Sequence, residues 1–219
     1  MSKINIFVAR HGETIFNKKE YIQGQSDAPL TVNGHQGAVD LGKELQDIEF
    51  CVAVSSNLRR AVTTRDIILD HNKNKETPRL IDPQFGEYNF GEYEGDSGIN
   101  FWEKISEKYG IDFSAMEKED FLAKYDYLYH ENDNPTAERA EDFKARLIKG
   151  MNEVIAEAKE KGHKNVLVVA HGIVVHGLIQ LLDNSYAFNG IIQNSSVTKF
   201  TYENDKFQIQ YVGQRTGEF

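Results

Sequence analysis

Three short apolar runs, rich in β-branched residues, constrain the fold of this chain more than any other feature. They comprise residues 4–9, 50–54 and 166–170. Each run is short and ends abruptly in polar residues, which is typical of a buried strand. Segments with helical spacing of apolar residues separate the runs. Because strands alternate with helices, we predict an α/β fold with a mostly parallel sheet, right-handed crossovers and helices on both faces.

Capping residues and turn formers delimit the other elements. Thr31 and Thr136 are expected N-caps, Ser55 and Ser56 are possible caps of the helix that follows them, and Gly162 is expected to end a helix. Residues 13–30 predict a loop with at most a helical turn. We predict helices at residues 31–46, 58–70, 136–161 and 173–182, and further strands at residues 80–81, 196–202 and 207–211.

The segment from Glu92 to Ala137 differs in composition from the rest. It contains twelve acidic residues against four lysines, and nine aromatic residues including the single tryptophan, Trp102. Helical pieces are expected at residues 101–108 and 118–129. We therefore interpret residues 1–219 as a single domain with an inserted, lid-like helical segment at about residues 92–137, packed over one end of the core.

Overall charge and composition narrow the class of protein. The chain has 219 residues, which suits one domain with a sizeable core, and a net charge of −9. That charge argues against nucleic acid or an anionic membrane as a partner. No run approaches the roughly 18 apolar residues of a membrane span, and the first strand leaves no room for a signal peptide. We expect a cytoplasmic protein without an internal disulfide, since Cys51 is the single cysteine.

Basic and imidazole side chains follow all three apolar runs. The first is followed by Arg10-His11-Gly12, the second by a segment with Arg59 and Arg60, and the third by His171-Gly172. In a parallel sheet these groups gather at one edge. Guanidinium groups bind phosphoryl oxygens in a bidentate manner, and an imidazole can attack phosphorus. Glu87, in a glycine-rich loop, could donate a proton to the leaving oxygen.

Five segments carry a resemblance to a known family over nearly the whole chain. They are residues 10–14 with Asn17 downstream, residues 22–31, residues 56–64, Glu87 with residues 90–91 and 94–95, and residues 169–172. In this order and spacing they resemble the motifs of the histidine phosphatase superfamily, the phosphoglycerate mutase-like group. The resemblance implies a three-layer α/β/α sandwich with a mixed, mainly parallel sheet.

The resemblance also implies a role for each matching residue. His11 would be the nucleophile and pass through a phosphohistidine, and Glu87 would be the general acid and then the base for water. The residues expected to hold the phosphoryl group are Arg10, Arg60, His171, Asn17, Gln23 and Gly24, the last two through their backbone.

Elementary electrostatics agrees with these roles. An unperturbed histidine pKa near 6.5 permits a neutral His11 at cellular pH, and two neighbouring guanidiniums favour the neutral form further. The same guanidiniums would repel a divalent cation, which disfavours the alternative of a metal site built on His11 and His171. Arginines stabilise phosphoryl transfer without a metal, so we expect neither a metal nor another cofactor.

The charge pattern favours a phosphatase over a mutase. The mutase branch of the family carries extra cations after the general acid, whereas no arginine occurs here between Arg79 and Arg139. The acidic insertion would repel a second anionic group. We therefore expect a metal-independent phosphomonoesterase that acts on a small phosphorylated metabolite, with phosphoglycerate mutase as the alternative. An inactive binding or regulatory homologue is a remote third, since all five catalytic positions are occupied.

Some features stay open at this level. Arg59 is a less certain match than Arg60, and Arg139 could reach the site or face solvent. His176, five residues after His171, is as compatible with core packing as with the site. The substrate and a homodimeric state are likewise open. The aromatic and acidic insertion is expected to prefer an apolar or cationic leaving group.

Overall fold

A six-stranded mixed sheet forms the centre of the protein. The computed structural model describes residues 3–110, 112, 122, 124–131, 136–162, 164–183 and 190–219. The strands are β1 (Ile4–Arg10), β2 (Val52–Ser55), β3 (Arg79–Ile81), β4 (Asn165–Ala170), β5 (Val197–Glu203) and β6 (Lys206–Gln214), in the order β3-β2-β4-β1-β5-β6. The first four run parallel, whereas β5 is antiparallel to β1 and β6 to β5. The predicted mixed, mainly parallel sheet is confirmed.

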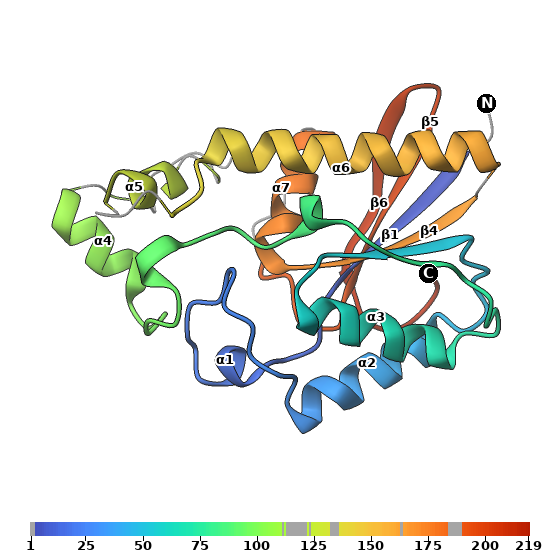
Figure 1. Ribbon diagram of the computed structural model, residues 1–219, viewed down its shortest axis with the longest axis horizontal. Helices are drawn as coiled ribbons and strands as arrows, with labels where there is room; N and C mark the ends of the chain where they lie inside the picture. The colour runs from blue at the N-terminus through green and yellow to red at the C-terminus, as the bar shows by residue number, and fades with distance from the viewer. Residues whose placement is uncertain are drawn as a thin grey trace.

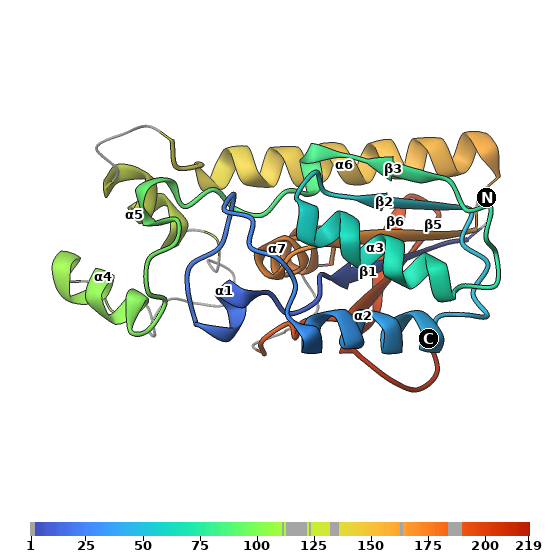
Figure 2. The ribbon, with the colours of Figure 1, turned by 60° about the horizontal axis from the view of Figure 1, so that its bottom comes forward.

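Helices cover both faces of this sheet (Figure 1, Figure 2). One face carries α2 (Val32–Glu44) and α3 (Arg59–His71), and the other carries α6 (Ala140–Lys161) and α7 (Gly172–Leu182). Along β1, Phe7 and Ala9 pack with the first helix pair, while Ile6 and Val8 pack with the second. Alternate residues of a strand point to opposite faces, so both faces of the central strands are apolar and buried.

Thr31 and Gly162 act as the sequence predicts. The Thr31 side chain accepts a hydrogen bond from the Gly34 amide and caps α2. Gly162 ends α6 in the left-handed region, with φ of 68°. The shorter helices are α1 (Ile15–Lys18), which precedes α2 and is capped by Thr14, and two single-turn 3₁₀ helices at Pro83–Phe85 and Gly91–Tyr93.

Two expected caps are wrong. The N-cap of α3 is Leu58, whose side chain makes no capping bond. The Arg59 and Arg60 amides donate to the Asp27 carboxylate instead, while the Ser56 hydroxyl bonds His171 and the Leu58 amide. The N-cap of α6 is Arg139 and not Thr136, and the Ala140 amide donates to the carboxylate of Asp126. In both cases a partner distant in sequence replaces the local cap.

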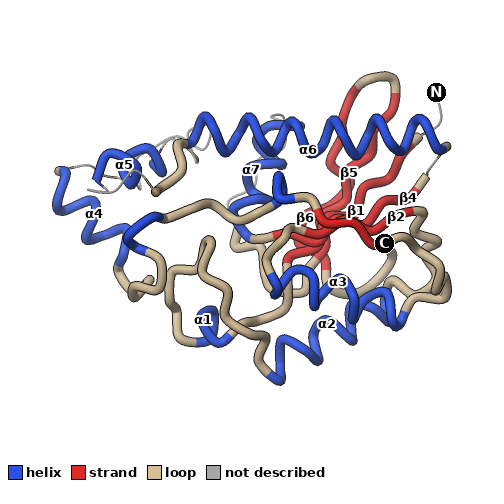
Figure 3. Tube along the Cα trace, in the orientation of Figure 1, coloured by secondary structure: helices blue, strands red, loops and turns tan. Residues whose placement is uncertain are grey.

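The acidic insertion places two helices beyond one end of the sheet, as the tube in Figure 3 shows. These helices are α4 (Phe101–Tyr109), close to the predicted piece, and α5 (Lys124–Glu131). Residues 118–121 of the second predicted piece lie outside the described residues. Phe101 and Tyr125 pack into the same apolar cluster as α6 and α7, so these helices are continuous with the core. None of the helices in the described ranges has the length and apolar character needed to cross a bilayer.

Candidate active site

The carboxyl ends of β1, β4 and β2 bring three polar strand ends together. Arg10 lies opposite Ala170 in the β1–β4 ladder, so the residues that follow, His11 and His171, become neighbours. Their ring centroids are 5.1 Å apart. The β2–β4 register places Ser56 on the other side, and its Oγ lies 2.7 Å from His171 Nε2. The expected gathering of the strand ends is therefore present.

His11 is buried and presents one ring nitrogen to the site. Its Nδ1 lies 2.8 Å from the Gly12 carbonyl oxygen, which can only accept, so Nδ1 carries the proton in the neutral ring. The other nitrogen, Nε2, keeps its lone pair and accepts from Arg60 Nε at 3.3 Å. Burial first, and then the charges of Arg60 and Arg10, hold the pKa of His11 well below 6.5. The ring is therefore neutral and nucleophilic at neutral pH.

Arg60 is held rigidly beside this lone pair. Its guanidinium donates to the carbonyl oxygens of Ser26 and Gly24, both at 2.7 Å, and to the Asp27 carboxylate at 3.3 Å. Asp27 also accepts from the backbone amides at the start of α3. Burial lowers the Arg60 pKa, whereas the charges of Glu87 and Asp27 raise it. A fixed planar donor suits an oxyanion of defined geometry.

Arg10 and His171 complete the positive side of the site. Arg10 donates to the Ile192 carbonyl oxygen, and burial lowers its pKa while Glu87 raises it. Burial, followed by Arg60, holds the His171 pKa well below 6.5. In the described part of the chain, His171 Nδ1 is buried without a hydrogen-bond partner. That nitrogen is therefore left for a ligand.

Glu87 is the buried acid of the site. One carboxylate oxygen accepts from the Tyr88 amide at 2.9 Å, and the other from the Ile173 amide at 3.1 Å, in the first turn of α7. Burial raises the pKa of Glu87 despite these bonds and the nearby charges of Arg10 and Arg60. A raised carboxyl pKa is what a general acid requires near neutral pH.

The loop that carries Glu87 is anchored by Arg146, to which no role was assigned from sequence. This α6 side chain donates to the carbonyl oxygens of Gln84, Gly86 and Glu87, and binds both carboxylate oxygens of Glu138. Arg146 lies 59 residues from Glu87 in sequence. No local sequence signal indicated this contact, because the partners of Arg146 come from the Glu87 loop and from Glu138, outside its own helix.

Asn17, Gln23 and Gly24 line the same region with different bonding. The Asn17 side-chain oxygen Oδ1 accepts from the Thr14 amide and from Asn194 Nδ2, which leaves the side-chain nitrogen Nδ2 of Asn17 as a donor. Gln23 Oε1 accepts from the Thr14 hydroxyl. The Gly24 amide donates to Glu94, and its carbonyl oxygen accepts from Arg60. Gly24 therefore positions Arg60 rather than offering a free amide.

Glu94 shapes the loop opposite His11. Its carboxylate accepts from the amides of Gly24, Gln25, Ser26 and Phe90, which ties residues 24–26 to residues 90–94. A Cβ at Gly24 would lie 2.0 Å from the Tyr88 carbonyl oxygen, so only glycine fits there. The motif match singled out Glu94 without indicating this structural role.

Arg59, Arg139 and His176, whose roles the sequence left open, lie in different environments. Arg59 exposes its side chain and contributes only its backbone amide, to Asp27. Arg139 pairs with Glu141 and stacks on Tyr129 at the surface. His176 is partly buried, and burial, followed by Lys124 and Arg10, lowers its pKa to about 4. Among the described residues, no three His, Cys, Asp or Glu side chains are grouped as metal ligands would be.

The arrangement can hold a phosphoryl group between two guanidiniums and present a neutral imidazole to its phosphorus, with a carboxyl group whose pKa is raised by burial in the same site. Known proteins of this design exist. Residues 6–215 match the histidine phosphatase superfamily (branch 1). A broad-specificity phosphatase of Saccharomyces cerevisiae, YOR283W, is 31% identical over 218 residues, which cover 98% of this chain and 85% of the yeast protein.

Phosphoglycerate mutases are also similar to this chain. The 2,3-bisphosphoglycerate-dependent enzyme of Streptococcus mutans is 30% identical over 194 residues, covering 81% of this chain and 83% of that protein. The crystal structure of phosphoglycerate mutase from Bacillus anthracis superposes with a TM-score of 0.88 at 31% identity, covering 98% and 94% of the two chains. The fold, the matched residues and these relatives together place this chain in the histidine phosphatase superfamily, branch 1, the phosphoglycerate mutase-like group.

Proposed function

We propose that this protein is a metal-independent phosphomonoesterase that acts through a phosphohistidine on a small phosphorylated metabolite. The observation that carries the proposal is the buried His11 ring, neutral and with its Nε2 lone pair beside the fixed Arg60 guanidinium. A nucleophile of this kind needs no metal or deprotonating base, because its reactive nitrogen already carries a lone pair.

In the first step, His11 Nε2 attacks phosphorus and the bond from phosphorus to the leaving oxygen breaks. Glu87, whose pKa burial raises, gives its proton to that oxygen. Arg10, Arg60 and His171 stabilise the charge on the remaining phosphoryl oxygens. In the second step, the Glu87 carboxylate takes a proton from water, which attacks the phosphohistidine and releases inorganic phosphate.

Hydrolysis of p-nitrophenyl phosphate, with and without EDTA, tests the proposal. His11→Ala is expected to lower kcat by about three orders of magnitude or more, because the covalent route is lost. EDTA is expected to leave the rate unchanged. His35→Ala is the matched control, since His35 is exposed on α2. An acid-labile, base-stable phosphoenzyme supports the mechanism, and activity that survives His11→Ala refutes it.

Mutase activity is the second candidate, favoured by the likeness to the Bacillus anthracis structure. A mutase would pass the phosphoryl group from His11 to a second hydroxyl, so only the acceptor differs. Partitioning of the ³²P-phosphoenzyme between water and 3-phosphoglycerate separates the two. Release of most of the label as inorganic phosphate supports the phosphatase, whereas transfer to 3-phosphoglycerate supports the mutase.

The insertion supports a proposal about the leaving group. Its acidic charge and the aromatic cluster around Trp102 and Tyr125 favour an apolar or cationic group over a second phosphate. Steady-state kinetics with aryl, sugar and bisphosphate esters tests this preference. The highest kcat/KM on a bisphosphate would contradict it.

A further inference from the structure

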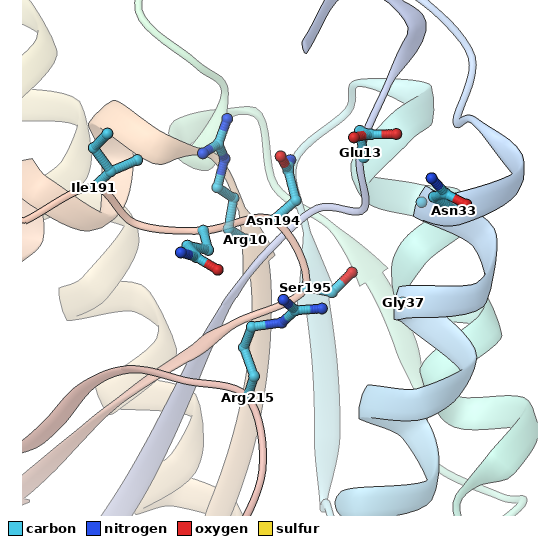
Figure 4. Close-up of a pocket in the computed structure, with 10 residues that line it drawn as sticks. Arg10, Glu13, Asn33, Gly37, Ile191, Asn194, Ser195 and Arg215 are labelled. Carbon is cyan, nitrogen blue, oxygen red and sulfur yellow. The ribbon is translucent and has the colours of Figure 1, made fainter. Parts of the chain in front are cut away.

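A polar pocket lies next to the end of β1, where Arg10 is one of the residues that line it. It has a volume of about 310 Å³ and opens between the start of α2, residues 191–195 and the segment after β6 (Figure 4). Arg10 is the single proposed catalytic residue in its lining. Its lining includes Arg10, Glu13, Gly37, Asn194, Ser195 and Arg215.

Ser195 points an unsatisfied hydroxyl at this pocket. The side chain is buried, with 3% of its surface exposed, and its Oγ has no hydrogen-bond partner in the described part of the chain. In Figure 4 this hydroxyl is directed toward α2. A buried hydroxyl without a hydrogen-bond partner destabilises the folded protein. A ligand that bonds to it would remove this penalty.

The space around the hydroxyl depends on a glycine. Gly37 lies inside α2, where glycine is less favourable for helix formation than alanine. A Cβ at this position would lie 3.0 Å from Ser195 Oγ, so a larger residue would occupy the pocket. The helix thus has a residue of low helix propensity at the position where a side chain would crowd the Ser195 hydroxyl and the pocket.

The charge of the pocket favours an anion. Arg215 reaches from the segment after β6 toward Ser195 (Figure 4), and within the described residues no carboxylate pairs with it. The one acidic residue in the lining, Glu13, accepts a hydrogen bond from the hydroxyl of Thr31, which is the N-cap of α2. Arg10 also lines the pocket, but its guanidinium donates to the Ile192 carbonyl oxygen and belongs to the proposed catalytic site, so Arg215 is the cation available to a ligand here.

Two residues of the pocket lining, Ser195 and Asn194, form hydrogen bonds with the backbone of His11, the proposed nucleophile. The Ser195 amide donates to the carbonyl oxygens of Arg10 and His11, at 3.1 and 3.2 Å. Asn194 Nδ2 donates to the His11 carbonyl oxygen at 3.0 Å and to Asn17 at 3.1 Å. A ligand on Ser195 would therefore act on the segment that positions the His11 ring.

We propose that this pocket is a second binding site for a phosphate group, either free phosphate or the phosphate of a small organic molecule, held by Ser195 and Arg215. Guanidinium and hydroxyl donors match the acceptor oxygens of a phosphate. The volume is at the lower end of the range for small-molecule sites, so it admits a phosphorylated metabolite as well as the free ion.

Titration of the ¹⁵N-labelled protein with inorganic phosphate and, separately, with phenylphosphonate tests the binding. The amide signals of Gly37 and Ser195 report on the pocket, and those of Gly172 and Ile173 report on the catalytic site. We expect two saturation curves with different dissociation constants. Tighter binding of phenylphosphonate at the pocket identifies an organic phosphate as its ligand, and tighter binding of phosphate identifies the free ion.

Two variants test the assignment of the ligands. Arg215→Gln is expected to weaken the pocket titration about tenfold or more and to leave the Gly172 titration unchanged. Arg139→Gln, which removes an exposed arginine on the insertion, is the matched control. Ser195→Ala is expected to weaken pocket binding and to raise Tm without ligand, because the unpaired hydroxyl is removed. A single titration shared by all four amides and unaffected by Arg215→Gln refutes the site.

Product inhibition tests the link to His11 and rests on the proposed phosphatase activity. Phosphate released last from a phosphoenzyme inhibits competitively at the catalytic site. Occupancy of the pocket adds a change in kcat, so inhibition is expected to be mixed in the native protein and competitive in Arg215→Gln. Competitive inhibition in both refutes the link. The amide titrations do not depend on activity, so they distinguish a failed pocket from a failed function.

Discussion

Arg146→Met is the substitution whose effect the structure predicts most sharply. Methionine keeps an unbranched apolar stem against Phe143, whose ring lies 4.6 Å from the native guanidinium carbon. It leaves three carbonyl oxygens of the Glu87 loop and the Glu138 carboxylate without their donor. Only 18% of the Arg146 side chain and 14% of the Glu138 side chain are exposed, so water replaces the lost bonds poorly.

The expected loss of stability follows from these bonds. Breaking one partner of a largely buried ion pair costs about 3–5 kcal/mol, and the orphaned carbonyls keep the cost in the upper part of this range. At roughly 2–4 °C per kcal/mol for a chain of this size, a cost of about 4–5 kcal/mol lowers Tm by roughly 8–20 °C. Lys149→Met is the control, because this exposed α6 lysine has one weak pair, at 4.0 Å. Differential scanning calorimetry measures both.

The same substitution is expected to affect the chemistry through Glu87. A misplaced general acid matters most when the leaving oxygen is a poor one. Arg146→Met should therefore lower kcat/KM on an alkyl phosphate more than on p-nitrophenyl phosphate, at a temperature where the variant is folded. Adding Glu138→Leu should restore part of the lost Tm, because it removes the uncompensated carboxylate. A Tm equal to that of Lys149→Met would refute the reasoning.

Three further predictions follow from the buried groups. Glu87→Gln should abolish the loss of kcat/KM at high pH, because the raised pKa of Glu87 makes the native enzyme lose its acid as pH rises; an unchanged pH profile would exclude Glu87 as the acid. The pKa values of His11 and His171 are lowered in the folded protein, so the unfolded chain binds more protons at these residues below about pH 6.5. The free energy of unfolding should therefore decrease as the pH is lowered, by up to ~1.4 kcal/mol per pH unit for each histidine. Urea unfolding between pH 7 and 5.5 in the Glu87→Gln background, which removes the opposite slope of that carboxyl, should show this fall, and a flat curve would contradict it. Gly24→Ala should lose most activity and several degrees of Tm, because its Cβ would meet the Tyr88 carbonyl oxygen at 2.0 Å; a native Tm by calorimetry would show that the loop can shift.

The order of strands and helices along the chain, and the gathering of the proposed catalytic side chains, could be predicted from the sequence. Apolar runs and their abrupt polar ends are local properties, and a parallel sheet brings such ends to one edge. His11, Arg60 and His171 were found for this reason, and Glu87 through its motif. Thr31 and Gly162 could be predicted because each caps its helix through hydrogen bonds with backbone groups only a few residues away in sequence.

The contacts that hold the site in place were decided only by the tertiary structure. Asp27 fixes Arg60 across 33 residues, Arg146 fixes Glu87 across 59, and Asn194 reaches the His11 carbonyl across 183. The same cause explains the wrong caps, since the amides at the start of α3 donate to Asp27 and the Ala140 amide of α6 donates to Asp126. A local pattern shows which groups need a partner, but which partner arrives depends on how distant segments pack.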